Sequence, residues 1–507
     1  MKNLFEKIPV AFQNITLLIG FVWILIAVRI KSIFLTYNSS IMNIHIKSIA
    51  SAFAFSFLFY SKSFGLNLFL ISILVVTLVA TIAKERKISW LYSFAYIATA
   101  IFVFLNPTGF TIFVHFMAFL VFVGKSISKK SSLYIAWILG VINLIIASIS
   151  NYNNKPAEKE EKKGFSPKVL NRIKGGLAAS LLLLIFSFLY KNANPVFGSL
   201  FEQINLDFIS IPWLFFTLLG YVIFLHILRP FDAKELIEFD LSQPNELAKP
   251  TEIVLIGQKK KLEGEHTLGS MVFLALNLLL VFFLVTDIIY LIQENDISNS
   301  EYSESVHQGV YALMFSIVCA IALILYFFRG NLNFFEGNKR IKSLTYLWIA
   351  LNVILVAFTC YKNYAYVEAL GLTYKRIGVF VYLLLTLTGL VTAYIKVSEI
   401  KNFTYLARTN IATLFAFLVI SAIIPWNKTI TRYNLTKIEN PDIGYLIELG
   451  DNNSGQLLKY SKENSQQLTA NAIKSIQDKH ASFSKEQTEK TWQEYHLYHL
   501  LNTDSKR

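Results

Sequence analysis

Residues 268–292 read LGSMVFLALNLLLVFFLVTDIIYLI, an apolar run in which Asp287 is the only charged side chain. About twenty helical residues cross the hydrocarbon core of a bilayer, so this run predicts a transmembrane helix. Comparable runs recur along the chain of 507 residues, which is 54% hydrophobic and only 16% charged. A soluble protein would carry roughly a quarter charged residues. The composition excludes a soluble enzyme, a disordered chain and a secreted disulfide scaffold, and it predicts a multi-span membrane protein.

The apolar runs predict an all-α, polytopic transmembrane helix bundle of about thirteen spans, and twelve to fourteen fit the pattern. Strands are excluded because the runs are continuous rather than alternating, and because an open sheet is not viable in lipid. The pair Asn106-Pro107 divides one long run into a hairpin. The expected spans cover residues 10–28, 41–60, 65–83, 90–105, 109–124, 133–150, 176–190, 208–228, 268–292, 306–328, 344–361, 376–396 and 408–425.

Polar segments divide the chain into four parts. We expect an N-terminal membrane half at 1–150 (about six spans), a charged cytoplasmic linker at 151–175, a C-terminal membrane half at 176–425 (about seven spans) and a small helical polar tail at 426–507. A cytoplasmic insert at 229–267 interrupts the second half. Pro244 and Pro250 argue against one long helix there, and the stretch 252–257 (EIVLIG) is expected to be a short strand or a docked segment.

The basic residues predict the orientation, because cytoplasmic loops of membrane proteins carry an excess of Lys and Arg. In the second half, the loops 229–267, 329–343 and 397–407 are basic, whereas 191–207, 293–305 and 362–375 hold only Lys191, Lys362 and Lys375. This pattern places the N-terminus in the cytoplasm and the tail outside. The same alternation puts the basic loops 84–89 and 125–132 outside as well. Either the rule fails there, or the span count in residues 1–150 is wrong by one or two.

The N-terminal run and the two cysteines bear on processing and redox chemistry. The apolar stretch 10–28 is too long for a signal-peptide core and has no small-residue cleavage site after it, so we expect a retained first span. Cys319 and Cys360 both lie inside apolar runs, at different expected depths. A disulfide requires Cα atoms within about 7 Å, so no bridge is expected.

Five stretches of the second half follow one another in a fixed order. They are Asn194 to Phe197 (NPVF), Tyr302 to Leu313 (YSESVHQGVYAL), Gly371 to Thr373 together with Arg376, Trp426 to Leu435 (WNKTITRYNL) and Asp442 to Leu449 (DIGYLIEL). Across roughly residues 170–460 the chain resembles a bacterial multi-pass inner-membrane family that is catalogued only as a domain of unknown function. The resemblance implies a polytopic inner-membrane protein with a polar C-terminal tail. It implies no activity, substrate or catalytic residue.

Polar side chains gather at the expected outer mouth of the last five spans. Glu304, His307 and Tyr311 are spaced i, i+3 and i+7, so they share one helix face. A cluster of this kind would bind a polar or anionic ligand, or sense pH through His307. The candidate ligand-binding residues are Asp287, Glu304, His307, Tyr311, Tyr364, Arg376 and Arg432.

A simpler interpretation competes with this site. Asp287 and Glu304 would then be ordinary interfacial residues, and the tyrosines would form an aromatic belt at the membrane surface. Inside the membrane, no Asp or Glu occupies a clear midplane position, which disfavours a coupled transporter. Asn143, Asn277 and Asn352 are expected to form hydrogen bonds between helices.

The sequence predicts no catalytic residue, no cofactor and no metal site. His496 and His499 are i, i+3 on a tail helix, but two histidines without a third ligand are more typical of a solvated face. Motifs for hydrolases and nucleotide-driven pumps are missing. Nucleic-acid binding is disfavoured despite the net charge of +14, because the basic residues lie in short loops beside the apolar runs.

Three classes of function fit the sequence. The first is a non-enzymatic envelope scaffold or sensor of the bacterial inner membrane, which meets an envelope protein or a small ligand on its outer face and otherwise contacts the lipid bilayer. The second is a transporter or permease of a small or lipid-like substrate. The third is a membrane-embedded enzyme that acts on envelope substrates. Missing motifs favour the first class.

Overall fold

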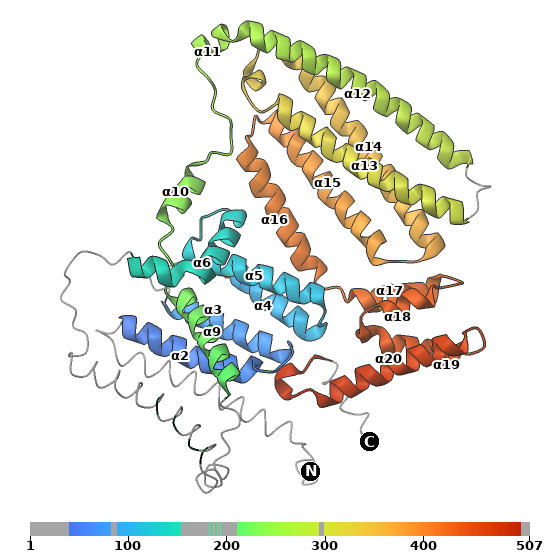
Figure 1. Cartoon of the computed structure of the whole chain (residues 1–507). Coiled ribbons are helices and arrows are strands. Elements are labelled where there is room, and N and C mark those ends of the chain that lie inside the picture. The colour runs from blue at the N-terminus through green and yellow to red at the C-terminus, as the bar shows by residue number, and fades with distance from the viewer. Residues whose placement is uncertain are drawn as a thin grey trace, which may run out of the picture.

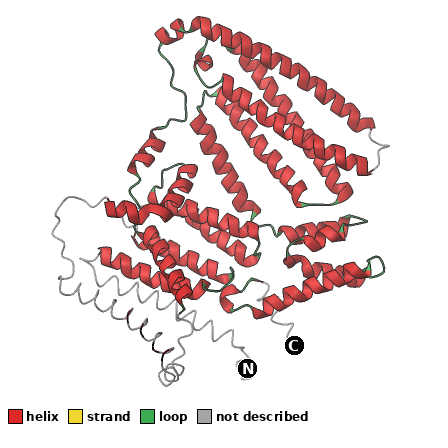
Figure 2. Cartoon of the chain, in the orientation of Figure 1, coloured by secondary structure: helices red, strands yellow, loops and turns green. Residues whose placement is uncertain are grey.

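The computed structural model describes residues 40–82, 89–153, 210–293 and 299–497, together with Leu182, Phe186, Tyr190 and Ala193. Helices dominate this part of the chain, and its only β-pairing is an isolated bridge between Glu246 and Lys401 (Figure 2). Seven of the helices are long and apolar enough to cross a membrane. The prediction of an all-α membrane bundle is therefore confirmed.

Each expected span between 41 and 425 corresponds to an apolar helix, except the range 176–190. That range, apart from three single residues, and the range 10–28 lie outside the described residues, so the span count stays a prediction. The helices are α2 (Ser40–Phe59), α3 (Leu66–Ile82), α4 (Trp90–Leu105), α5 (Gly109–Ile127), α6 (Leu133–Asn153), α9 (Ile211–Leu228), α12 (Lys259–Gln293), α13 (Asn299–Phe327), α14 (Lys339–Leu370), α15 (Tyr374–Ser398) and α16 (Phe403–Ser421).

Helices α2 to α6 form one bundle with α9, which the sequence assigned to the C-terminal half but which packs mainly against α2. In the structure we therefore call α2 to α6 with α9 the N-terminal half, and α12 to α16 the C-terminal half. Helix α5 packs closely on α6 because Gly124 faces the backbone of Ala136, and Gly140 faces the backbone of Leu120. The predicted hydrogen bond between helices at Asn143 is present: its Nδ2 donates to the carbonyl of His226 at 2.8 Å. Its Oδ1 also accepts from the amide of Phe231 at 3.1 Å. These two hydrogen bonds of the Asn143 side chain hold the end of α9 against α6.

In the C-terminal half, α12 to α15 lie side by side (Figure 1). Their shared core includes the fully buried Phe273, Ile317, Ile324, Leu355 and Leu390. Helix α12 has 35 residues, which corresponds to about 50 Å at about 1.5 Å per residue, whereas the hydrocarbon core is about 30 Å thick. The long helices therefore extend beyond the bilayer by several turns.

The asparagines of the C-terminal half divide into two kinds. Asn277 donates from α12 to the carbonyl of Leu344 on α14 at 2.9 Å, as predicted for a bond between helices. Asn352 instead donates to the carbonyl of Trp348, one turn earlier on its own helix, at 2.7 Å. The Nδ2 group of Asn352 therefore does not form the predicted hydrogen bond to another helix.

The insert between the halves contains two short helices, α10 (Lys234–Ser242) and α11 (Glu252–Gly257). The stretch 252–257 is therefore a helix. Of the two alternatives expected for it, the short strand was wrong, whereas Leu255 does pack against the core of the C-terminal half. The apolar residues of this stretch have no adjacent strand to pair with, and α12 follows almost directly at Lys259. Extended chain at 243–251, which contains both prolines, separates the two helices.

One buried carboxylate, that of Asp240 on α10, joins both membrane halves. It accepts hydrogen bonds from the amide and hydroxyl of Ser132 at 2.6 and 2.8 Å, and from the hydroxyl of Tyr134 at 3.3 Å. Arg408 of α16 reaches the same carboxylate at 3.3 Å. Burial alone would raise the pKa of Asp240, but the hydrogen bonds from Ser132 and the guanidinium of Arg408 hold the pKa below its ordinary value.

These contacts define two faces of the bundle. The insert and the α5–α6, α13–α14 and α15–α16 connections contact one another, and we call the side on which they lie the insert face. For example, the ammonium group of Lys396 donates to the carbonyls of Phe328 and Lys401 at 2.8 and 2.9 Å. The loop 128–132 thus lies on the same side as the insert, whereas the alternation counted from the sequence placed it opposite. The sequence left two explanations open, a failure of the basic-loop rule or an error in the number of spans. The structure favours the second, because the basic loop 128–132 lies on the same side as the other basic loops.

The tail packs on the opposite side, which we call the tail face. In Figure 1 it lies below α13 to α15 and to the right of the N-terminal helices. Its helices are α17 (Trp426–Lys437), α18 (Ile443–Glu448), α19 (Ser454–Glu463) and α20 (Ala470–Glu489), with short 3-10 turns at 451–453 and 492–494. Their small core is built from the buried apolar residues Ile430, Leu446, Leu449, Leu457 and Ile476. Helix α20 buries only Ile476 and Gln487 fully, as expected for a helix at the surface.

The close packing of α5 on α6 gives a first prediction. Ala in place of Gly inside a helix normally stabilises by up to about 1 kcal/mol. Gly124→Ala should instead destabilise the protein by about 1–3 kcal/mol, because the added methyl group overlaps the carbonyl of Ala136. Thermal unfolding in detergent measures the change. Gly378→Ala on α15 is the matched control, since no atom lies within 4 Å of its added methyl group. Equal melting temperatures for the two variants would contradict the packing argument.

Candidate functional site

Asp287 on α12 forms an ion pair with Lys362 on α14. Its Oδ1 lies 2.5 Å from Nζ of Lys362, and both side chains are almost buried, with 9% and 13% of their surface exposed. The acidic turn after Asp287 contains no lysine, but α14 supplies Lys362 to the carboxylate of Asp287. A buried carboxylate without a partner costs several kcal/mol, so Lys362 makes the position of Asp287 tolerable. The other oxygen, Oδ2, is buried and accepts no hydrogen bond in the described structure.

Arg376, near the start of α15, binds backbone carbonyls of the connection between α14 and α15. Its guanidinium donates to the carbonyl of Leu370 at 2.9 Å and to that of Gly371. It also lies 3.9 Å above the ring of Tyr366, a cation–π distance. The last carbonyls of a helix carry partial negative charge, which a guanidinium compensates. Arg376 is therefore largely occupied by its own turn rather than presented to solvent.

A small polar rim lies at the tail face, and we define it as the exposed Tyr364, Glu368 and Arg432 together with the half-buried Tyr433. The hydroxyl of Tyr364 donates to Glu368 at 2.6 Å across one helical turn. Burial, and then the negative charge of Glu368, raise the pKa of Tyr433 on α17. Arg432 beside it is exposed, and its guanidinium forms no ion pair with a carboxylate among the described residues. The rim combines residues from α14 and from the tail.

The three residues predicted on one face near the start of span ten lie in α13. The helix includes Glu304, His307 and Tyr311, so their spacing of i, i+3 and i+7 applies. Their side chains lie outside the described part of the structure. Whether His307 approaches Asp287 therefore stays a prediction.

A chain of amide side chains links the tail to both membrane halves. Tyr374 of α15 donates its hydroxyl to Asn427 of α17 at 2.5 Å. Asn427 donates to Asn452 at 2.9 Å, and Asn452 donates to Asn106 in the α4–α5 turn at 2.6 Å. From the sequence Asn106 is recognisable only as a helix breaker, and nothing near it indicates this link. The amides bind partners up to 346 positions away, and sequence spacing gives no signal for such contacts.

The turn between α14 and α15 is built to receive Asn434 of α17. Asn434 accepts from the amide of Leu372 at 2.6 Å and donates to its carbonyl at 2.9 Å. Gly371 has a φ of 85°, which favours glycine, and a Cβ there would lie 2.7 Å from Oδ1 of Asn434. The hydroxyl of Tyr445 also accepts from the amide of Tyr374 at 3.0 Å. The stretches Gly371 to Arg376, Trp426 to Leu435 and Asp442 to Leu449, which carried the family resemblance, thus meet in space.

Glu494 fastens the end of the tail to the α2–α3 turn. Its carboxylate accepts from the amide and hydroxyl of Ser63 at 2.8 and 2.9 Å, and from the amide and hydroxyl of Thr491 at 3.1 and 2.7 Å. Burial alone would raise the pKa of Glu494, but these hydrogen bonds outweigh it and lower the pKa to about 2. The amide of Leu66 donates to the carbonyl of Tyr495 at 3.0 Å beside it. Glu494 therefore stays ionised and bound at physiological pH.

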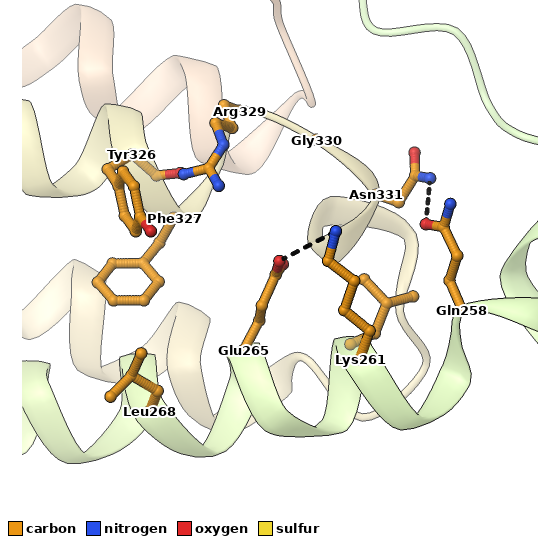
Figure 3. A pocket seen from close by; sticks show the side chains of 10 residues that line it. Gln258, Lys261, Glu265, Leu268, Tyr326, Phe327, Arg329, Gly330 and Asn331 are labelled. Carbon is orange, nitrogen blue, oxygen red and sulfur yellow. Dashed lines mark hydrogen bonds and ion pairs between the residues drawn. The ribbon is translucent and has the colours of Figure 1, made fainter.

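A cavity of about 230 Å³ lies at the insert face between the start of α12 and the end of α13. Figure 3 shows Lys261 and Glu265 side by side on α12, one turn apart, with their charged atoms 4.0 Å from each other. Arg329 folds back over the ring of Tyr326 at 4.0 Å, and Asn331 donates to Gln258 at 3.0 Å. The lining thus contains two cations and one carboxylate, and the carboxylate pairs with the lysine of its own helix. The described residues contain no cluster of three or more His, Cys, Asp or Glu side chains that could hold a metal ion.

Comparison with known proteins gave one match. The sequence profile of a family described as "Domain of unknown function (DUF4153)" matches residues 49–460. This range includes ten of the eleven apolar helices in full and most of α2, together with the insert and the first tail helices. No curated protein and no solved structure matches the chain.

The buried ion pair gives a prediction that a double-mutant cycle tests. Lys362→Met leaves Asp287 buried without a partner and should destabilise the protein by about 3–5 kcal/mol. Combining it with Asp287→Leu removes both charges and should restore much of that loss. Unfolding of the four proteins in detergent gives the coupling free energy. A double variant as unstable as the sum of the two single variants would show that the pair is not coupled.

The carboxylate of Glu494 gives a pH dependence. Its pKa is lowered, so its stabilising effect is complete above an unfolded-state pKa near 4.3 and is lost as the pH falls towards 2. At pH 7, Glu494→Gln should lower the hydrogen-exchange protection of the amides of Ser63 and Leu66 about tenfold. In the unmodified protein the same protection should fall as the pH drops below about 4.

The exposed Glu463, which pairs with Lys459 at 3.8 Å, is the control position. Glu463→Gln should leave the protection of Ser63 and Leu66 unchanged. Protection that is insensitive to Glu494→Gln at pH 7 would show that the carboxylate does not hold the tail.

Proposed function

The chain belongs to the family described as "Domain of unknown function (DUF4153)", and from its geometry we propose that it is a non-enzymatic scaffold or sensor of the bacterial cytoplasmic membrane. In this proposal the insert face is cytoplasmic and the docked tail lies outside. The exposed rim of Tyr364, Glu368, Arg432 and Tyr433 is the surface that meets an envelope protein or a small ligand.

The distribution of basic residues supports this orientation. The tail-face turns at 60–65, 106–108 and 371–373 hold one basic residue, Lys62. The insert-face connections at 128–132, 229–258, 329–338 and 399–402 hold many, including Lys129, Lys130 and Arg329. Short loops rich in Lys and Arg remain in the cytoplasm, whereas a domain as long as the tail translocates largely regardless of its charge.

The observation that carries the proposal is the amide chain from Tyr374 through Asn427 and Asn452 to Asn106. It joins the C-terminal half to the N-terminal half through the tail, and Glu494 adds a second attachment at Ser63. A tail held at both halves favours a platform over a lid that opens at each turnover. The ionisable groups beneath it support the same conclusion, because Asp287 and Arg376 are engaged by neighbours instead of facing a reaction cleft.

The rim is the part of the predicted ligand-binding cluster that remains accessible. It presents a carboxylate, a guanidinium and two phenols on the exposed edge between α14 and α17. Aromatic and arginine side chains are the residue types enriched where proteins meet partners. Glu304, His307 and Tyr311, at the start of α13, would extend this surface if they face the same side.

Cysteine labelling tests the orientation. Cys319 and Cys360 are first replaced by Ala, and single cysteines are then placed at Lys260 on the insert face and at Lys437 on the tail face, both exposed positions. In intact cells an impermeant maleimide should label position 437, and it should label position 260 only after permeabilisation. The reverse pattern would overturn the proposed orientation.

Substitutions at the rim test the function. In cells that lack the gene, Arg432→Ala and Glu368→Gln should fail to complement at normal protein abundance, because they remove the charges that a partner meets. Lys459→Ala, an exposed tail position away from the rim, is the control and should complement fully. Full complementation by both rim variants would reject the rim as the functional surface. If a variant of the bundle interior then failed at normal abundance, a transporter or permease would be the better conclusion.

A further inference from the structure

A second cavity, of about 320 Å³, opens at the insert face between α4, α5, α6 and α16. This volume is at the lower end of the range of roughly 300–1,000 Å³ that is typical of small-ligand sites. Its lining residues are Tyr92, Lys125, Lys130, Ser131, Ser132, Leu133, Leu241, Arg408 and Ala412. Three of them are cations and none is a carboxylate, in contrast to the cavity that contains Glu265.

Lys125 is the most unusual of these cations, because it is 93% buried in the last turn of α5. Its ammonium group donates to the carbonyls of Ser131 and Lys129, the latter at 3.5 Å, and lies 4.9 Å from the centre of the Tyr92 ring. No carboxylate of the described residues forms an ion pair with it. Burying an ammonium group is costly unless an anion compensates it. The charge of Asp240 also acts on Lys125, but Arg408 shares the same carboxylate, so one negative charge faces the three cations of the lining.

The carboxylate of Asp240, just behind the cavity, is already occupied. Two bonds from Ser132, one from Tyr134 and the guanidinium of Arg408 satisfy it. The exposed Lys130 forms no ion pair with a described residue and can reach over the mouth. The cavity therefore keeps a net positive charge that an anionic group would neutralise.

The position of the cavity indicates where such an anion comes from. Lys125 is at the end of the candidate span 109–127, and Arg408 is in the second turn of α16, so the cavity lies at the depth of lipid headgroups. Helix α16 is the least buried of the seven candidate spans and lies between the two halves (Figure 1). From the cavity, Ala412, Ala416 and Ile420 follow at four-residue spacing and form an exposed apolar stripe along α16. A stripe of this kind provides a place for an acyl chain.

We propose that this cavity binds the phosphate headgroup of an anionic membrane phospholipid. Lys125 and Lys130 contact the phosphate, Tyr92 packs beside Lys125, and the exposed stripe on α16 contacts an acyl chain. Basic pockets between transmembrane helices at the cytoplasmic surface are a recognised type of site for anionic lipids. The site is on the face opposite to the rim and requires only that the chain spans a membrane, so it does not depend on the proposed partner surface.

Native mass spectrometry of the full chain in detergent tests the proposal. Phosphatidylglycerol should bind at least tenfold more tightly than phosphatidylcholine of the same chain length, since only the former has a net negative charge. Lys130→Ala should weaken the binding of phosphatidylglycerol about tenfold, as expected for the loss of one charge-assisted hydrogen bond. Lys125→Met should weaken it at least as much. Lys249→Ala, an exposed lysine of the insert outside the cavity, is the matched control and should have no effect.

The remaining outcomes distinguish the two sources of a phosphate group. Inorganic phosphate at millimolar concentration should leave the bound phosphatidylglycerol in place, because it makes no contact with the apolar stripe. Complete displacement by phosphate would overturn the assignment to a lipid. Equal binding of the two lipids, or equal effects of Lys130→Ala and Lys249→Ala, would overturn the site itself. Lys130 is exposed, so its variant keeps the test valid even if Lys125→Met does not fold.

Discussion

The carboxylate of Asp240 is buried at the point where three parts of the chain meet. Ser132 and Tyr134 belong to the N-terminal half, Arg408 belongs to the C-terminal half, and Asp240 itself comes from the insert between them. A buried charge is tolerated only where hydrogen bonds and an opposite charge replace its lost hydration. The position of α10, and with it the alignment of the two halves at the insert face, follows from this requirement.

At the tail face the two halves are joined differently. The links there are mainly amide side chains and backbone groups, with Asn434 bound to Leu372 and Asn452 bound to Asn106. Glu494 is the charged exception, and it is held by hydroxyl and amide donors more closely than by its distant neighbour Lys62 at 3.9 Å. Hydrogen bonds between uncharged amide groups depend on geometry more than on ionic strength or pH. The tail should therefore remain docked over a wide range of conditions.

Between these two attachments, α16 crosses from one face to the other with little protein around it. Its exposed apolar surface, which includes Leu414 and Ile420, needs lipid or another apolar partner to cover it. The same helix carries Arg408, which binds Asp240 and lines the basic cavity. The helix that connects the two halves is thus also the least buried of the seven candidate membrane spans.

The amino-acid sequence by itself determined the elements. Among the described residues the long apolar runs are helices, because a bilayer leaves the backbone no other hydrogen-bond partners. Asn106-Pro107 ends a helix through local sterics. The polar segment 426–507 was likewise predicted to be a small helical tail, and its described residues form helices α17 to α20. The basic loops 229–267, 329–343 and 397–407 were predicted to lie on one side of the membrane. The contacts among the insert, Phe328 and Lys401 agree with that grouping.

Only the tertiary structure decided which polar groups meet. Lys362 pairs with Asp287 from 75 positions away, and Asn452 reaches Asn106 across 346 positions. Both pairs depend on how whole helices pack, and no local spacing in the sequence encodes such a distance. The same holds for Arg376, whose charge is satisfied by the carbonyls of its own turn, and for Lys125, whose burial creates the basic cavity. Residue type predicted that these side chains are polar, but packing decided which of them remain accessible to a ligand.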